Sequence, residues 1–146
     1  MKSLSLKQGE LDDVHNWQDE FYSRNLIKRN HDYELVLLCW QPGQSSPIHD
    51  HDNKHGWISF IEGVITEKWY KLFENVDGNN IKILKEFTYK AGDVSYINDE
   101  IAFHKIANES PKRAITLHLY VRPVDKCKSY NPETAEAKSY KMGYNN

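Results

Sequence analysis

Short apolar runs, each ended by a turn signal, recur along most of this chain and limit what it can fold into. The breaks between them are rich in glycine, asparagine and aspartate, as in Asp77-Gly78-Asn79-Asn80, and these residues favour tight turns. Runs of this length bounded by such turns are typical of strands rather than helices. We therefore expect an all-β fold, a barrel or a sandwich. The runs are Tyr33–Trp40, Trp57–Glu62, Val64–Phe73, Ile81–Phe87, Val94–Ile97 and Ile115–Val121.

The length of 146 residues suits a single domain with a core of its own. We expect an N-terminal helix within residues 1–21, a barrel over residues 22–125 and a C-terminal tail over residues 126–146. The helix is expected because apolar residues recur there at intervals of three and four. The tail has no clear period and is expected to pack outside the barrel. The apolar residues of the helix are Leu11, Val14, Trp17 and Phe21.

Charge and composition narrow the choice of partners. A net charge of −2 gives no electrostatic reason for binding nucleic acid or an anionic membrane, so a small molecule is the expected partner and a monomer the expected state. No segment has the apolar length of a signal peptide or a membrane span, so we expect a cytoplasmic protein. The two cysteines are Cys39, inside an apolar run, and Cys127, and both are expected to be reduced.

Three of the seven histidines fall within seven residues, at His49, His51 and His55. On an extended backbone, positions two apart share a face, so His49 and His51 form a candidate half-site for a metal. A polar loop with solvated histidines fits the same short motif. A third ligand is available at His104, and His55 is a candidate for supporting a ligand from outside.

The stretch that contains the histidine pair resembles the first motif of the cupin superfamily of β-barrels. Gly43, then His49 and His51, and finally Gly63 lie at the spacing of that motif. The position that usually holds glutamate is Gly56. Without that carboxylate the ligands are three neutral nitrogens, which leave two positive charges on a divalent ion, so an anionic group such as a thiolate can bind the metal directly.

A second segment resembles the second cupin motif, with Gly92 upstream, His104 and then Asn108. Asp99 and Ile101 stand where that motif usually has proline and glycine.

From about residue 21 to residue 125 the chain is more closely similar to the cysteine dioxygenases, the thiol dioxygenase branch of the cupins. Five separated segments resemble family signatures in the expected order, and chance agreement at five ordered places is improbable. The segments are Tyr22–Leu26, Leu38–Trp40, Ser46–His51, Tyr96–Asp99 and Leu117–Tyr120.

The resemblance implies a site and a reaction. His49, His51 and His104 would be the ligands of Fe(II), and L-cysteine would react with O2 to give cysteine sulfinic acid. Arg24 would bind the substrate carboxylate, a task that suits its planar fork of donors. Tyr22 would flank that arginine.

Thr116, His118 and Tyr120 are spaced by two, so on a strand they project to one face and can form a hydrogen-bonded chain. An ordinary barrel strand with one polar face is the alternative. The resemblance implies a relay that ends at Tyr120 near the iron. Animal members of the family have a cysteine at the position of Gly56, linked to the tyrosine that matches Tyr120. Glycine cannot form this thioether, so none is expected here.

Two other functions are compatible with the sequence. One is a dioxygenase for another small thiol such as mercaptopropionate, although family members of that kind tend to have glutamine in place of Arg24. The other is a cupin without enzymatic activity that binds a metal or ligand.

Overall fold

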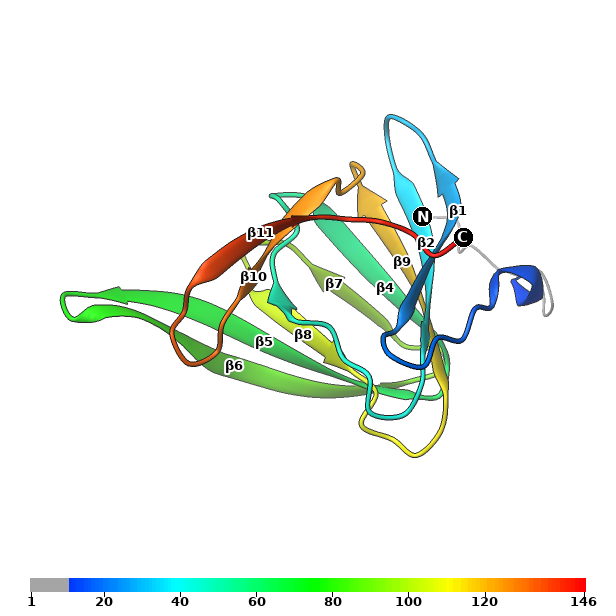
Figure 1. Cartoon of the computed structure of the whole chain (residues 1–146), viewed down its shortest axis with the longest axis horizontal. Coiled ribbons are helices and arrows are strands. Elements are labelled where there is room, and N and C mark those ends of the chain that lie inside the picture. The colour runs from blue at the N-terminus through cyan, green and yellow to red at the C-terminus, as the bar shows by residue number, and fades with distance from the viewer. Residues whose placement is uncertain (1–10) are drawn as a thin grey trace.

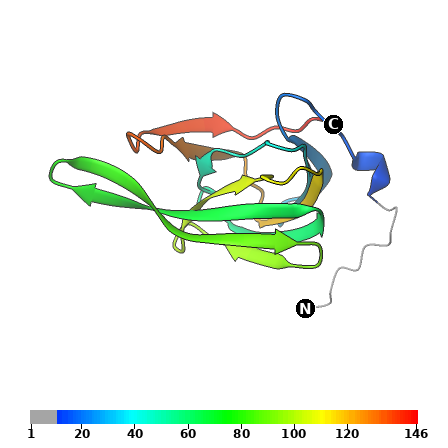
Figure 2. The same cartoon turned by 90° about the horizontal axis from the view of Figure 1, so that it is seen from below.

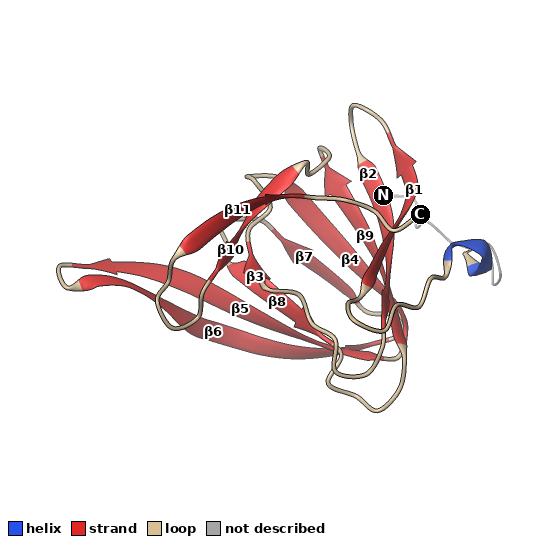
Figure 3. Cartoon of the chain, in the orientation of Figure 1, coloured by secondary structure: helices blue, strands red, loops and turns tan. Residues whose placement is uncertain are grey.

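The computed structural model describes residues 11–146, which form two antiparallel sheets that face each other as a barrel (Figures 1 and 3). The five-stranded sheet contains, in spatial order, β1 (Ser23–Arg29), β2 (Glu34–Trp40), β9 (Ala114–Val121), β4 (His55–Glu62) and β7 (Val94–Ile97). The six-stranded sheet contains β11 (Ala137–Lys141), β10 (Lys126–Tyr130), β3 (Ile48–His49), β8 (Phe103–Ala107), β5 (Val64–Asn75) and β6 (Gly78–Lys90). The predicted all-β barrel is confirmed.

Each of the six apolar runs overlaps a strand, namely β2, β4, β5, β6, β7 or β9. The predicted turn between β5 and β6 is a tight one, because Asn75 pairs with Gly78 across it. This long hairpin projects beyond the rest of the barrel (Figures 1 and 2). The strands β1, β3, β8, β10 and β11 were not predicted.

The expected N-terminal helix is present only as a short segment. Part of it falls on residues 1–10, outside the described residues, and the remainder has only one turn of 3-10 helix, Asp12–Val14. The turn ends because His15 is extended, and the Asn16 carbonyl accepts a hydrogen bond from the Ser23 hydroxyl instead of continuing a helix. The apolar spacing nevertheless predicted part of the packing correctly, because Leu11, Val14 and Trp17 cover an apolar cluster on the five-stranded sheet. Phe21 is 71% exposed.

The segment after Asp125 also differs from expectation, because it contributes two strands to the six-stranded sheet. Its apolar signal is weak, since Cys127 is the one buried residue in β10 and β11 has none. Backbone pairing holds it instead: β10 pairs with β11 over five residue pairs and with β3 at Ser129 and Tyr130. The short strand β3 thus lies between β10 and β8.

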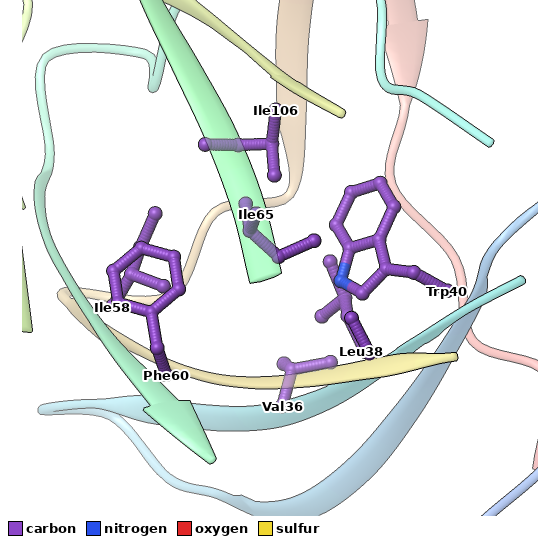
Figure 4. Close-up of a cluster of buried hydrophobic side chains, with 8 residues drawn as sticks. Val36, Leu38, Trp40, Ile58, Phe60, Ile65 and Ile106 are labelled. Atoms are coloured by element: carbon purple, nitrogen blue, oxygen red, sulfur yellow. The ribbon is translucent and has the colours of Figure 1, made fainter. Parts of the chain in front are cut away.

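Burial on both faces explains the continuous apolar run of β2, a pattern typical of strands covered on both sides. Its inward residues join the main core between the sheets, which Figure 4 shows, whereas Leu37 and Cys39 belong to the outer cluster under the N-terminal segment. The core fills one end of the barrel interior. Its buried members are Val36, Leu38, Trp40, Ile58, Phe60, Ile65, Ile106 and Ala114.

Beyond the core, inward-facing positions of the same strands hold polar residues. On β9 the inward series runs from Ala114 through Thr116 and His118 to Tyr120, and the partner positions on β2 run from Trp40 to Glu34. The barrel interior therefore changes from apolar to polar along its strands, and the polar half contains the predicted site.

Gly63 provides a test of the tight connection between β4 and β5. Its φ is +78°, and a Cβ there would lie 2.5 Å from the Arg113 carbonyl oxygen. We expect Gly63→Ala to lower the free energy of unfolding by about 3 kcal/mol, from backbone strain and overlap together. Gly43 has a φ of +85° with open space around it, so Gly43→Ala should cost only about 1 kcal/mol. Urea unfolding followed by tryptophan fluorescence measures both, and equal losses would contradict the proposed overlap.

Candidate functional site

Three histidines from separate parts of the chain meet in the polar half of the barrel. His49 on β3 is paired directly with His104 on β8, and His51 follows two residues after His49. The Nε2 atom of His104 lies 3.1 Å from Nε2 of His49 and 3.0 Å from Nε2 of His51. His51 and His104 are buried and His49 nearly so. The structure therefore brings together the three predicted ligands.

The opposite ring nitrogen of each histidine faces an oxygen atom. Nδ1 of His49 lies 2.9 Å from the Pro47 carbonyl oxygen, and Nδ1 of His104 lies 3.1 Å from Oε1 of Glu67. Nδ1 of His51 lies 3.3 Å from Oδ1 of Asp99. A carbonyl or carboxylate oxygen can only accept, so Nδ1 carries the proton in all three rings. The lone pairs of the three Nε2 atoms then point toward one another.

This arrangement fits a divalent metal. Two nitrogen ligands at a right angle with bonds of about 2.1 Å lie about 3.0 Å apart, which matches the separations given above. Burial and the neighbouring histidines hold the pKa values of His49 and His104 well below the ordinary value, so these rings are neutral ligands. Three converging lone pairs would repel one another unless a cation lies between them. The donor set fits Fe(II), and three imidazoles also suit other divalent transition metals.

Two carboxylates that orient the ligands were not predicted from the sequence. Glu67 is fully buried and accepts hydrogen bonds from Trp69 and Ser95 besides His104. Burial raises the pKa of Glu67. The alternation of residues along β5 could have indicated Glu67. It comes two residues after the core residue Ile65, so its side chain shares the same inward face.

Asp99 holds the loop that contains His51. It accepts the backbone N–H groups of His51 and Asn53, each at 2.8 Å. Burial raises the pKa of Asp99, but the hydrogen bonds from His51 and Asn53 outweigh burial and lower it overall. In the sequence, Asp99 stood out only as a departure from the second cupin motif. In the structure, this residue holds the loop that contains His51. Carboxylates behind histidine ligands fix the ring orientation in metal sites.

The predicted series on β9 forms a continuous chain of hydrogen bonds. Thr116 Oγ1 lies 2.8 Å from Nε2 of His118, and Nδ1 of His118 lies 3.1 Å from the Tyr120 hydroxyl. The chain also has a start that the sequence did not indicate, because Nε1 of Trp40 donates to Thr116 Oγ1 at 2.8 Å.

The donor-only Trp40 sets the direction of this chain. Thr116 accepts from Trp40, so its own proton is free for Nε2 of His118. His118 then carries its proton on Nδ1 and donates to the Tyr120 oxygen, which leaves the Tyr120 proton available to a further acceptor. Burial raises the pKa of Tyr120, so the phenol stays protonated. Its ring lies 6.1 Å from that of His51, between centroids.

Gly56 is paired directly with Tyr120 across β4 and β9. A Cβ at this position would lie 3.3 Å from Cε1 of the Tyr120 ring. The residue that departs from the cupin glutamate therefore faces the phenol at the end of the relay.

Arg24 lies on β1 and is 8% exposed. Its Nη1 donates to the Gly143 carbonyl at 3.1 Å, whereas its buried Nη2 has no hydrogen-bond partner among residues 11–146. Burial is the main cause of the low pKa of His118, and the Arg24 charge contributes to it, so the guanidinium acts on the same interior. Tyr22 stacks on Trp40, with ring centroids 4.3 Å apart, and thereby places β1 against the relay.

The remaining histidines lie apart from this cluster. His55 is exposed, and its Nδ1 lies 2.6 Å from the Tyr96 hydroxyl, so it does not support a metal ligand. His31 is exposed beside Asp32, and His15 packs edge-on against Trp17.

A β-barrel whose interior presents three converging histidines is the architecture of a metal-binding cupin. Among solved structures, an uncharacterised protein with a double-stranded β-helix domain from Klebsiella pneumoniae is similar, with a TM-score of 0.62, 16% identity and coverage of 96% of this chain and 92% of that chain. A cupin superfamily protein from Desulfitobacterium hafniense has a TM-score of 0.57 at 11% identity and covers 76% of this chain and 86% of its own. At these identities the likeness shows the fold alone.

The sequence itself identifies the family. Residues 2–133 match the family described as cysteine dioxygenase type I, and the chain belongs to it. A curated relative, cysteine dioxygenase type 1 of Rattus norvegicus, is 33% identical over 127 residues, which cover 84% of this chain and 62% of the relative. The chain thus spans somewhat less than two thirds of the length of that relative. Among residues 11–146, no helix is long and apolar enough to cross a bilayer.

His118 should make stability depend on pH. Its pKa is well below 6.5 in the folded protein because it is buried, whereas the unfolded chain titrates near 6.5. Below that pH the unfolded chain binds a proton that the folded protein does not, so stability falls by about 1.4 kcal/mol per pH unit for this group. Above pH 7 both states are neutral and the contribution vanishes.

The test compares urea unfolding of wild type and His118→Asn between pH 5 and pH 7, both with chelator. The free energy of unfolding of the variant should depend less steeply on pH, by a slope that corresponds to about one bound proton. Parallel curves would show that His118 is protonated in the folded protein.

Proposed function

We propose that this protein is an Fe(II)-dependent thiol dioxygenase that converts L-cysteine and O2 into cysteine sulfinic acid. The observation that carries the proposal is the presence, in one barrel interior, of three converging imidazole nitrogens and a buried guanidinium, one donor of which has no hydrogen-bond partner among the residues described. Family membership supports the same reaction. His49, His51 and His104 would hold the iron.

When bound, Fe(II) supplies a redox-active centre at which a thiolate and dioxygen can react. The protein contributes position and charge. Because the three ligands are neutral, they favour a substrate that brings its own negative charge. Holding both reactants in one orientation removes much of the entropic cost of the reaction.

Arg24 is proposed to bind the carboxylate of the substrate. Within the described part of the chain its buried Nη2 has no hydrogen-bond partner, and leaving a charged donor unsatisfied costs more free energy than a typical hydrogen bond contributes. A carboxylate would remove that cost through a charge-assisted hydrogen bond. Tyr22 is proposed to flank the arginine, with its own ring stacked on Trp40.

Tyr120 is proposed to donate its proton to the substrate or to a developing negative charge on oxygen. Thr116 and His118 hold it in the donating state through the chain described above. Gly56 supplies no sulfur for a thioether, so Tyr120 would act without a covalent link.

The reaction balances without an external reductant. The thiol and O2 combine to give a sulfinic acid, so two S–O bonds form as the O–O bond breaks. The sulfur loses four electrons, O2 gains them, and the thiol proton remains with the product. We infer that no further redox cofactor takes part.

Two rival functions remain distinguishable. Arg24 suits a substrate with a carboxylate, and another small thiol acid such as mercaptopropionate shares that group, so relative turnover on the two thiols decides between them. A cupin that only binds a metal or ligand would consume no oxygen.

The test is oxygen uptake by the Fe(II)-loaded protein with cysteine, combined with mass spectrometry of the product made from labelled O2. We expect a mass increase of two labelled oxygen atoms per cysteine. Absence of uptake across a panel of small thiols would exclude the enzyme, and a product without two labelled atoms would exclude a dioxygenase.

Arg24→Gln tests the carboxylate role. Loss of a hydrogen bond to a charged group typically costs about 1.5–3 kcal/mol, so kcat/KM for cysteine should fall roughly 10- to 100-fold. Cysteamine lacks the carboxylate, so its kcat/KM should change little. An equal loss on both thiols would count against carboxylate binding.

A further inference from the structure

Glu34 is a fully buried carboxylate whose oxygens are both engaged by groups other than Arg24. Its Oε2 accepts the backbone N–H of Val124 at 3.0 Å, and its Oε1 accepts the hydroxyl of Tyr144. Nη2 of Arg24 lies 4.0 Å from that same Oε1, too far for a hydrogen bond. The nearest carboxylate to Arg24 is therefore satisfied elsewhere.

Tyr144 is held between several charged groups. Its hydroxyl donates to Glu34 and accepts from Nη1 of Arg29 at 2.9 Å. Its ring lies under the Arg24 guanidinium, with 5.6 Å between Cζ and the ring centroid. Nη1 of Arg29 stays 3.9 Å from Oε1 of Glu34, so Tyr144 lies between both arginines and the carboxylate.

From this geometry we propose that Tyr144 is a specificity-determining positioning residue, which keeps Arg24 available for substrate by occupying Glu34. Without the hydroxyl, Oε1 of Glu34 would lose its donor. Arg29 is held by Asp125 through its Nη2, so Nη2 of Arg24 would move to replace the hydroxyl. The resulting ion pair would compete with the carboxylate of the substrate. The inference rests on the proposed function, because it assigns Arg24 to a thiol carboxylate.

The chain around Tyr144 is anchored independently of its hydroxyl. The Asn145 side chain accepts the Arg24 N–H at 2.8 Å, and the Asn145 N–H donates to the Arg24 carbonyl at 2.7 Å. Asn146 bonds to Leu26 through its side chain alone, which accepts the Leu26 N–H at 2.9 Å and donates from Nδ2 to the Leu26 carbonyl at 3.0 Å. These two asparagines cover the free edge of β1, which is the edge strand of its sheet. Tyr144→Phe therefore removes one hydroxyl and leaves the ring and the segment attached.

The test measures KM and kcat of Tyr144→Phe on cysteine and on cysteamine. If the new ion pair forms in about nine molecules of ten, the apparent affinity for a carboxylate falls about tenfold. KM for cysteine should rise by about that factor with kcat little changed, and KM for cysteamine should stay the same. Tyr70→Phe is the matched control, since it removes a hydroxyl on β5 whose charged neighbours are Lys68, Glu86 and Glu109, and it should change neither KM.

Rescue separates this role from simple anchoring. In the double variant Tyr144→Phe with Glu34→Gln the competing charge is gone, so KM for cysteine should return toward the wild-type value. Equal rises on both thiols, or a double variant worse than the single one, would overturn the proposal.

A crystal structure of metal-free Tyr144→Phe tests the role of Tyr144 without a measurement of activity. The separation of 4.0 Å between Nη2 of Arg24 and Oε1 of Glu34 should shorten to about 2.8 Å. An unchanged separation would overturn the role of Tyr144 even if the protein is a dioxygenase. A wild-type protein that oxidises no thiol would overturn the proposed function, and the separation would still report whether Tyr144 keeps Arg24 apart from Glu34.

Discussion

The convergence of three Nε2 lone pairs is the constraint on which the polar half of this barrel depends. Neutral imidazoles turn their lone pairs toward one point only if each Nδ1 proton has an acceptor on the far side. Three different elements supply these acceptors: the Pro47 carbonyl before β3, Glu67 on β5 and Asp99 after β7. The candidate metal site is therefore a product of the sheet as a whole, because neighbouring strands must keep register to orient the rings.

Strand pairing explains how a short strand can carry a ligand. β3 is only two residues long, and an isolated strand of that length has no stability of its own. It is held between β8, through the pair of His49 with His104, and β10, through the pair of His49 with Ser129. The C-terminal hairpin is thus part of the support of the candidate metal site, although it lies far from His49 in the sequence.

The alternation of residues along strands allowed much of the site to be predicted, and the limits have physical causes. Spacing by two placed His49 with His51, and Thr116 with His118 and Tyr120, because period-two geometry is local. The same rule applied to β5 would have identified Glu67, since it follows the inward-facing Ile65 by two residues.

Other parts of the site could not be read from local pattern. Trp40 looks like one more apolar residue of β2, and only the pairing of β2 with β9 shows that its N–H reaches Thr116. The strands β10 and β11 bury almost no apolar side chain, so they leave no periodic signal. The N-terminal segment shows the converse, because its apolar spacing correctly predicted the packing of Leu11 and Trp17, although the helix there is only one 3-10 turn, Asp12–Val14.

Charge links the two ends of the site. A divalent ion with three neutral ligands and the guanidinium of Arg24 would together bring three positive charges into one interior, while Glu67 and Asp99 are engaged behind the histidines. The buried carboxylate of Glu34 is the neighbour that could neutralise Arg24, and Tyr144 and Val124 already occupy its oxygens. A small molecule with a thiolate and a carboxylate would therefore meet unbalanced positive charge at both of its ends. In the proposed function, selectivity for such a molecule would follow from where the protein has already placed its own negative charges, as much as from the groups that would touch the substrate.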